Sequence, residues 1–168
     1  RNFRQTENSL IIENAYRINN GENLVLKPYS DDLDFVFIKV DNEQQAREKV
    51  LRIIEYYKDE YGFNSANFQA LVPMYRGEAG IDNLNNLIRD KFNPETLFTI
   101  KNKYSYKRGD KVMQLKNNYE KEIFNGEQGI VAGYDKEENV LLIDYEGLYV
   151  EYYADELEEL TLSYAMSV

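Results

Sequence analysis

Apolar residues recur along the first 92 positions with a helical spacing that two short apolar runs interrupt. Residues 9–18, 42–57 and 81–92 place apolar side chains three and four positions apart, which predicts three amphipathic helices. Residues 34–40 (DFVFIKV) predict a largely buried strand, and residues 68–72 predict a second strand that ends at Pro73. Strands and helices that alternate in this way favour a βαβ arrangement around a parallel sheet.

The last third of the chain has a different pattern. Short strands are predicted between residues 111 and 150, separated by Asn125-Gly126, by residues 135–139 and by Glu146-Gly147, which is typical of a small β-barrel. Residues 155–160 predict one helical turn, and residues 160–168 predict a final strand. We therefore expect an α/β fold with three parts: an α/β layer at 1–103, a barrel at 104–156, and a strand at 157–168 that returns to the first sheet.

Composition excludes several classes of chemistry. The 168 residues contain neither histidine nor cysteine, so thiolate and histidine metal sites, a cysteine nucleophile and a Ser-His-Asp triad are ruled out, and no metal ligand is predicted. No apolar run approaches the ~18 residues that a membrane span needs, so no membrane partner is expected. Because the chain starts at Arg1 and stops within the apolar stretch 162–168, we expect it to be a fragment of a longer protein.

Charge is distributed unevenly around a net value of −10. Residues 99–125 carry seven basic and three acidic side chains and include Tyr104, Tyr106 and Tyr119, whereas residues 126–168 carry one basic and eleven acidic side chains. Basic residues interleaved with aromatic ones suit a surface that follows phosphates and stacks bases. The alternative is a solvated strand face that balances an acidic neighbour, and charge alone favours this alternative.

The strongest local signal is the segment LVPMYRGEAGIDNLN at residues 71–85. An apolar strand leads through a loop with Gly77 and Gly80 into a helix, and such loops lie at the ligand-binding edge of open α/β sheets. Backbone N–H groups there can approach an anion, Arg76 can contact a phosphate, and Tyr75 offers a ring to a base. The alternative is that the glycines serve only the turn and that Arg76 is merely exposed.

No phosphate-binding loop of the form GxxxxGK[ST] is found, so the chain alone is not expected to bind or hydrolyse ATP in the P-loop manner. A small carboxylate-based enzyme is a further alternative. The acidic cluster at 155–159 lacks a basic or glycine-lined partner in the sequence, and we expect it to be a solvated turn.

Three ordered blocks resemble the RecD-type DNA helicases of superfamily one. They are NFRQTENSLIIENAYRIN, LVPMYRGEAGIDNLNNLI, and GDKVMQLKNNYEKEIFNGEQGIV followed by LTLSYAMSV. The resemblance implies a partial RecA-like parallel-sheet domain, the second motor domain of a helicase, with an inserted SH3-like β-barrel. It also implies that the phosphate-binding loop precedes Arg1 and that a His-Lys-Ser-Gln segment follows Val168 in the parent protein.

The same resemblance assigns roles to individual residues. Arg4, with Gln5 beside it, would reach the γ-phosphate of ATP as an arginine finger, although without the family Arg4 would be taken for a surface residue. Tyr75, Arg76, Gly77 and Asn85 would contact single-stranded DNA, and Asn85 could equally make a structural hydrogen bond. Asn125-Gly126 would lie near the DNA path, whereas local evidence alone predicts a type I′ turn there.

The resulting hypothesis is a fragment of an ATP-dependent helicase that moves along single-stranded DNA and unwinds duplex. ATP and Mg²⁺ would serve the intact parent, and none is expected to bind this fragment. Its partners would be single-stranded DNA, the first motor domain of the parent, and other subunits of a nuclease-helicase complex acting in DNA repair and recombination. We expect a cytoplasmic protein. The alternative is a non-catalytic module that binds protein or nucleic acid.

Overall fold

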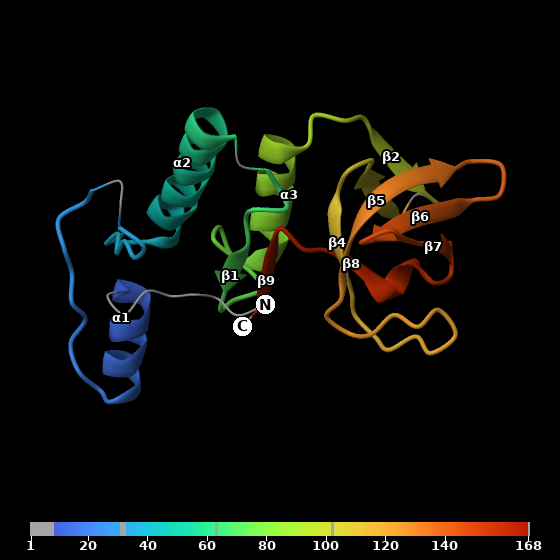
Figure 1. Cartoon of the computed structure of the whole chain (residues 1–168). Coiled ribbons are helices and arrows are strands. Elements are labelled where there is room, and N and C mark those ends of the chain that lie inside the picture. Colours follow the sequence, from blue (N-terminus) through green and yellow to red (C-terminus); the bar gives the residue numbers. More distant parts are fainter. Residues whose placement is uncertain (1–8, 31–32, 63, 102, 168) are drawn as a thin grey trace. The chain divides into compact units, whose positions relative to one another are not determined.

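The computed structural model describes residues 9–30, 33–62, 64–101 and 103–167, and the chain divides into two compact units between Val40 and Asp41. In the first unit, helix α1 (Leu10–Asn19) begins after Ser9, whose hydroxyl accepts the N–H of Ile12. This confirms the helix predicted at 9–18 (Figure 1). The buried side chain of Asn14 pairs with the backbone of Val25 in both directions, at 3.0 and 2.8 Å, and so fixes the extended segment that follows the helix.

The prediction of a buried strand at 34–40 is wrong. Among the described residues this segment pairs with no strand, and Val36, Phe37 and Ile38 are 45%, 55% and 42% exposed. A run of β-branched and aromatic residues forms a strand only where a neighbour completes its hydrogen bonds and covers its side chains. Instead, this segment is joined to the start of α1 by the Asp34 carboxylate, which accepts hydrogen bonds from the Ser9 hydroxyl and the Leu10 N–H.

The second unit begins with an α/β layer. Helix α2 (Glu43–Tyr61) starts after Asn42, which caps the Gln45 N–H, and helix α3 (Ile81–Phe92) packs beside it. Strand β1 (Ala70–Val72) pairs in parallel with strand β9 (Ala165–Ser167), and α3 contacts β9. The two helices predicted at 42–57 and 81–92 are therefore confirmed, and the parallel sheet has two strands in the described chain.

A five-stranded antiparallel sheet follows, which we call the barrel (Figure 1). Its strands are β4 (Lys111–Gln114), β5 (Gln128–Asp135), β6 (Val140–Tyr145), β7 (Leu148–Tyr153) and β8 (Leu160–Leu162), in the order β7-β6-β5-β4-β8. The hairpin of β2 (Leu97–Ile100) and β3 (Tyr104–Lys107) adds side chains to its core. Alternate positions of β6 and β7 point into that core, as the period-two pattern predicts.

The end of the chain forms two strands rather than the single one predicted from residue 160. Leu160–Leu162 complete the barrel beside β4, and Ala165–Ser167 run parallel to β1. Between them Ser163 donates its N–H to the Lys111 carbonyl at 2.9 Å, so the backbone bends where it changes partner. The helical turn predicted just before is present as a 3₁₀ turn at Leu157–Glu159.

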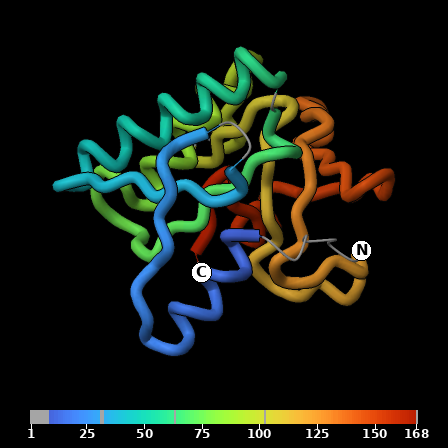
Figure 2. The backbone as a smooth tube through the Cα atoms, turned by 60° about the vertical axis from the view of Figure 1, so that its left-hand side comes forward, coloured from blue at the N-terminus to red at the C-terminus, as the bar shows by residue number. Residues whose placement is uncertain are grey.

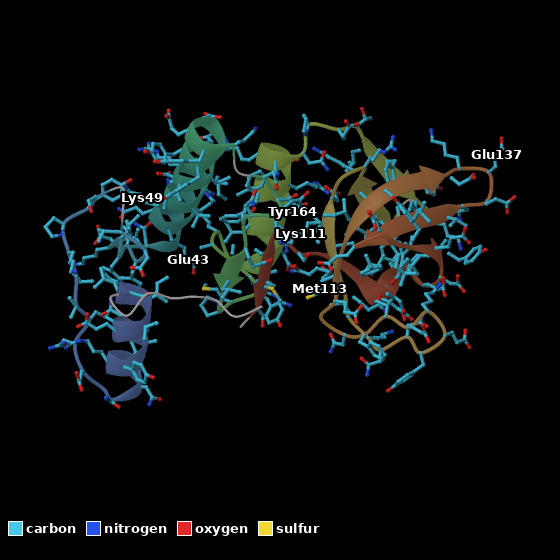
Figure 3. The ribbon with its side chains drawn as sticks, viewed as in Figure 1. Glu43, Lys49, Lys111, Met113, Glu137 and Tyr164 are labelled. Atoms are coloured by element: carbon cyan, nitrogen blue, oxygen red, sulfur yellow. The ribbon has the colours of Figure 1, made fainter. Side chains whose placement is uncertain are left out.

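Buried polar side chains join the barrel to the α/β layer (Figure 3). The Asp110 carboxylate is fully buried and accepts hydrogen bonds from Asn93 (2.9 Å), from the Tyr164 hydroxyl (3.1 Å) and from the Lys107 N–H (2.7 Å). Burial raises the pKa of Asp110, and these donors act in the opposite direction. Because Asn93 ends α3 and Tyr164 precedes β9, this one carboxylate holds three segments together.

No helix of the described residues is long and apolar enough to cross a membrane.

Candidate nucleic-acid interface

The loop at residues 73–80 is held by its own backbone. The N–H groups of Ile81 and Asp82, at the start of α3, donate to the carbonyls of Met74 (3.0 Å) and Tyr75 (3.4 Å). Gly80 lies so close to the loop that a Cβ atom there would be 2.5 Å from the Arg76 carbonyl oxygen. These helix donors, which the sequence suggested for an anion, are thus already bonded within the chain.

A carboxylate occupies the remaining part of this loop. Oε2 of Glu43, at the start of α2, accepts the N–H of Glu78 at 3.0 Å, and a Cβ atom on Gly77 would be 2.4 Å from the same oxygen. Gly77 has a φ of 99°, which other residues rarely adopt. The Glu43 carboxylate of the protein itself therefore lies where the sequence suggested an external anion, and anion binding by this loop stays a prediction. Glu43 was missed because it lies 34 positions before Gly77.

The predicted side chains of this block have different environments. Tyr75 is 63% exposed and Arg76 is exposed, so both can meet a ligand. Asn85 is 4% exposed, and its amide bonds both the carbonyl (2.9 Å) and the N–H (2.8 Å) of Ala165. This pairing favours the structural alternative for Asn85, which attaches α3 to β9.

Three of the seven basic side chains at 99–125 are neutralised by ion pairs. Lys107 pairs with Asp90 at 3.0 Å, Lys116 with Glu158 at 2.8 Å, and Lys121 with Glu156 at 3.0 Å. The acidic partners of Lys116 and Lys121 belong to the negatively charged last quarter of the chain. The alternative of a basic face that balances an acidic neighbour therefore describes these residues better than a phosphate-tracking surface.

The loop at residues 115–127, which we call the barrel loop, extends beyond the strands of the barrel (Figures 1 and 2, gold). Its tip carries two exposed aromatic side chains, Tyr119 (75% exposed) and Phe124 (43%), whose rings meet edge to face at 6.0 Å between centroids. Asn125 and Gly126 are exposed next to them. An exposed aromatic pair on a fixed loop offers stacking surfaces to bases. Phe124 was not singled out from the sequence, although it directly precedes the predicted turn.

The turn at Asn125-Gly126 is not of type I′. Glu127 donates its N–H to the Phe124 carbonyl at 3.0 Å, and only Gly126 of the two central residues has a positive φ, 92°. This is the pattern of a type II turn. Asn117 accepts the Asn125 N–H at 2.9 Å, so the turn is fixed against the other side of the barrel loop rather than by two flanking strands.

A buried hydrogen-bond chain supports the barrel loop from below. The Tyr145 and Tyr152 hydroxyls lie 2.9 Å apart, and Tyr152 donates to the side-chain Oε1 of Gln114 at 2.9 Å. Gln114 in turn donates to Glu159 at 2.8 Å, and the same carboxylate accepts from Asn118 in the loop at 3.2 Å. Burial raises the pKa of both tyrosines.

The candidate arginine finger Arg4 and its neighbour Gln5 lie outside the described residues. Among the described residues no group of three or more acidic side chains is placed to hold a metal ion.

Sequence comparisons identify relatives for most of the chain. Residues 84–145 match the family described as the SH3 domain of ATP-dependent RecD-like DNA helicases. Over 167 residues the chain is 33% identical to the ATP-dependent RecD2 DNA helicase of Deinococcus radiodurans. The aligned region covers 99% of this chain and 22% of that protein. The chain therefore spans about a fifth of that relative's length. These two findings confirm the resemblance to RecD-type helicases.

Solved structures of Pif1 from Bacteroides sp. are also similar. The structure of Pif1 bound to single-stranded DNA has 19% identity and a TM-score of 0.46, over 99% of this chain and 41% of that one. The complex of Pif1 with ADP-AlF4 has 16% identity and a TM-score of 0.41 over the same shares.

Proposed function

We propose that this segment of a RecD-like DNA helicase forms part of a single-stranded DNA track and part of one motor lobe in an ATP-dependent translocating enzyme. The observation that carries the proposal is the pair of exposed surfaces in the second unit. One is the loop at 73–80 with Tyr75 and Arg76, and the other is the barrel loop with Tyr119 and Phe124. Together they offer the cation and the aromatic faces that single-strand binding uses.

The motor part of the proposal is supported by the α/β layer. Parallel strands β1 and β9, with α3 against them, have the arrangement expected of one βαβ element of a RecA-like sheet. The loop after β1 leaves the carboxyl end of that strand, which is the ligand edge of such sheets. The barrel would then be an SH3-like insertion whose last strand leads back into the sheet.

The DNA part is tested by measuring the affinity of the 168-residue chain for oligo-dT. Fluorescence anisotropy gives this affinity at several salt concentrations. We expect weak binding that falls steeply as salt rises, because phosphate contacts release counterions. Arg76→Ala should weaken binding and reduce the slope of log K against log salt by about one. Arg52→Ala, an exposed arginine on α2, is the matched control and should leave both unchanged.

The role of Arg4 is a separate proposal that rests on the resemblance. In the intact parent, which would hold ATP and Mg²⁺ and close its first motor domain against this lobe, Arg4 would stabilise charge on the transferred phosphoryl group. Arg4→Ala in that parent should abolish ATP hydrolysis and leave oligo-dT affinity unchanged. Turnover near the parent's own rate would remove this assignment while the DNA-track proposal stands.

A second candidate function is a non-catalytic module that docks a protein. The acidic last quarter of the chain favours it, because its carboxylates form ion pairs with Lys116 and Lys121 and so take two cations of the barrel loop away from DNA. Absence of oligo-dT binding together with salt-independent binding to a protein partner would support the module. Membership of a larger nuclease complex and a cytoplasmic location stay predictions.

A further inference from the structure

A groove of about 760 Å³ lies in the second unit between the turn at 66–69 and the barrel. Gly126 of the barrel loop borders it, and Tyr145 of the buried hydrogen-bond chain forms part of its wall. Its size falls within the range of pockets that bind small organic ligands. The groove therefore connects a turn predicted to lie near DNA with the interior network of the barrel.

Gln128 gives the groove an amide that is only partly used. Its nitrogen donates to Gln69 Oε1 at 3.0 Å and to the Met166 sulfur at 3.7 Å, and a thioether is a weak acceptor. Its carbonyl oxygen takes part in no hydrogen bond with the described residues, and the side chain is half-buried. An amide in this state can exchange the sulfur for a better acceptor and offer its oxygen to a donor.

Lys111, on β4, adds a cation to the lining of the groove. Its ammonium, on a side chain that is largely buried, donates to the carbonyls of Ser65 (3.3 Å) and Phe68 (3.1 Å) and to Gln69 Oε1 (3.0 Å). All three acceptors are neutral, and within the described chain no carboxylate forms an ion pair with it. Its three N–H donors are used within the chain, so Lys111 contributes its positive charge to the groove rather than a hydrogen bond to a ligand.

The rim of the groove carries negative charge, which disfavours a phosphate. Glu127 and Glu146 line it, both are exposed, and neither forms an ion pair with a described residue. These two carboxylates repel an anion and can accept N–H groups, and Phe68 and Tyr145 add aromatic surface to the lining. The groove thus suits a flat, neutral ligand that carries both hydrogen-bond donors and acceptors on its edge.

We propose that this groove is a subsite for one nucleobase of single-stranded DNA, with Gln128 and the rim carboxylates bonding the edge of the base. Glutamine and glutamate side chains make such contacts with base edges. The choice of a nucleobase among flat neutral ligands rests on the proposed DNA-track function.

The direct test is saturation-transfer NMR of the 168-residue chain with the four deoxynucleosides at millimolar concentration, with deoxyribose 5-phosphate as the comparison ligand. We expect transfer to the base protons and none to the phosphosugar. Ala66→Trp, at an exposed position of the groove, should abolish the transfer, and Gln128→Ala should reduce it several-fold. Ser105→Trp, an exposed small residue on β3, is the matched control and should change nothing.

Two results would overturn the subsite: transfer to the phosphosugar but not to the nucleosides, or nucleoside binding that Ala66→Trp leaves intact. An oligo-dT experiment separates this inference from the proposed function. Equal oligo-dT affinity of the unmodified chain and of Ala66→Trp overturns the subsite and leaves the DNA track standing. Nucleoside binding without any oligo-dT binding overturns the DNA track and supports a base-sized groove with another role.

Discussion

The loop at 73–80 and the barrel loop both carry exposed side chains and are both held by hydrogen bonds, but they differ in what holds them and in the charge that they expose. The first is held by backbone hydrogen bonds to α3 and by the Glu43 carboxylate, and its outward groups are the Tyr75 ring and a cation. The second is held by buried side chains, its lysines are ion-paired, and its outward groups are two aromatic rings. The comparison shows that the loop at 73–80 offers a ring beside a cation without an ion pair in the described chain, whereas the barrel loop offers rings beside lysines that are already neutralised.

The largest effect is expected from removing the stacking surface. Tyr119→Ala combined with Phe124→Ala should weaken oligo-dT binding by about 1–3 kcal/mol for each base that loses its stacking partner. The slope of log K against log salt should stay unchanged, because no phosphate contact is lost. Tyr149→Ala, at a tyrosine of β7 that is 60% exposed, is the control. A changed salt slope in the double variant would contradict the prediction that the barrel loop offers rings and makes no phosphate contact.

The support of the barrel loop can be tested without DNA. Tyr152→Phe removes the hydroxyl that links Tyr145 to Gln114 and leaves two buried polar groups without their partner. We expect the free energy of unfolding to fall by about 1–3 kcal/mol in urea denaturation. Tyr153→Phe alters an exposed neighbour on β7 and should have almost no effect. Equal stability of the two variants would show that the buried chain does not support the barrel.

A smaller effect of opposite sign is expected at the other loop. Glu43→Gln removes the negative charge that lies against Gly77 and the Glu78 N–H, so a DNA phosphate meets less repulsion there. Affinity for oligo-dT should rise by about 0.3–1 kcal/mol at low salt and by less at high salt. Glu48→Gln, on the same helix, is the matched control. An increase as large in the control would mean that only net charge matters.

The smallest signal concerns pH. Burial raises the pKa of Tyr106, Tyr145, Tyr152 and Tyr164 above the ordinary value of 10.0. A group whose folded pKa is raised contributes stability that is fully present below its unfolded pKa and is lost as pH rises toward the folded value. Stability should therefore decline above about pH 10. Absorbance at 295 nm should show these four tyrosines ionising only together with unfolding, and their gradual ionisation in the folded chain would contradict this.

Local signals determined the helices, while strand partners remained hidden. Apolar side chains three and four positions apart predicted all three helices, because this spacing is a property of neighbouring residues in the sequence. Residues 34–40 have the composition of a strand but no neighbour among the described residues, and residues 160–167 change partner in mid-run. Composition along the chain cannot reveal either fact, since pairing is decided by segments far away in sequence.

The residues of the candidate site could also be predicted only in part from the sequence. Tyr75 and Arg76 are exposed, as a ligand-binding role needs, because a strand-loop-helix pattern places them at an open edge. Asn85 looked equivalent to Tyr75 and Arg76 in the sequence, yet its amide is hydrogen-bonded to the backbone of Ala165, 80 positions later in the chain. Glu43 reaches the loop at 73–80, and Gln128 reaches the groove, only through tertiary packing. No spacing of residues in the sequence indicates either position.

The bend at Ser163-Tyr164 has a mechanical consequence. The same short run of residues belongs to the barrel on one side and to the parallel sheet on the other, and Tyr164 is anchored to the buried Asp110. Only Ser163 and Tyr164 separate β8 from β9, so the link between the barrel and the parallel sheet is short. We therefore expect a displacement of β8 to move β9, the strand beside β1, with it.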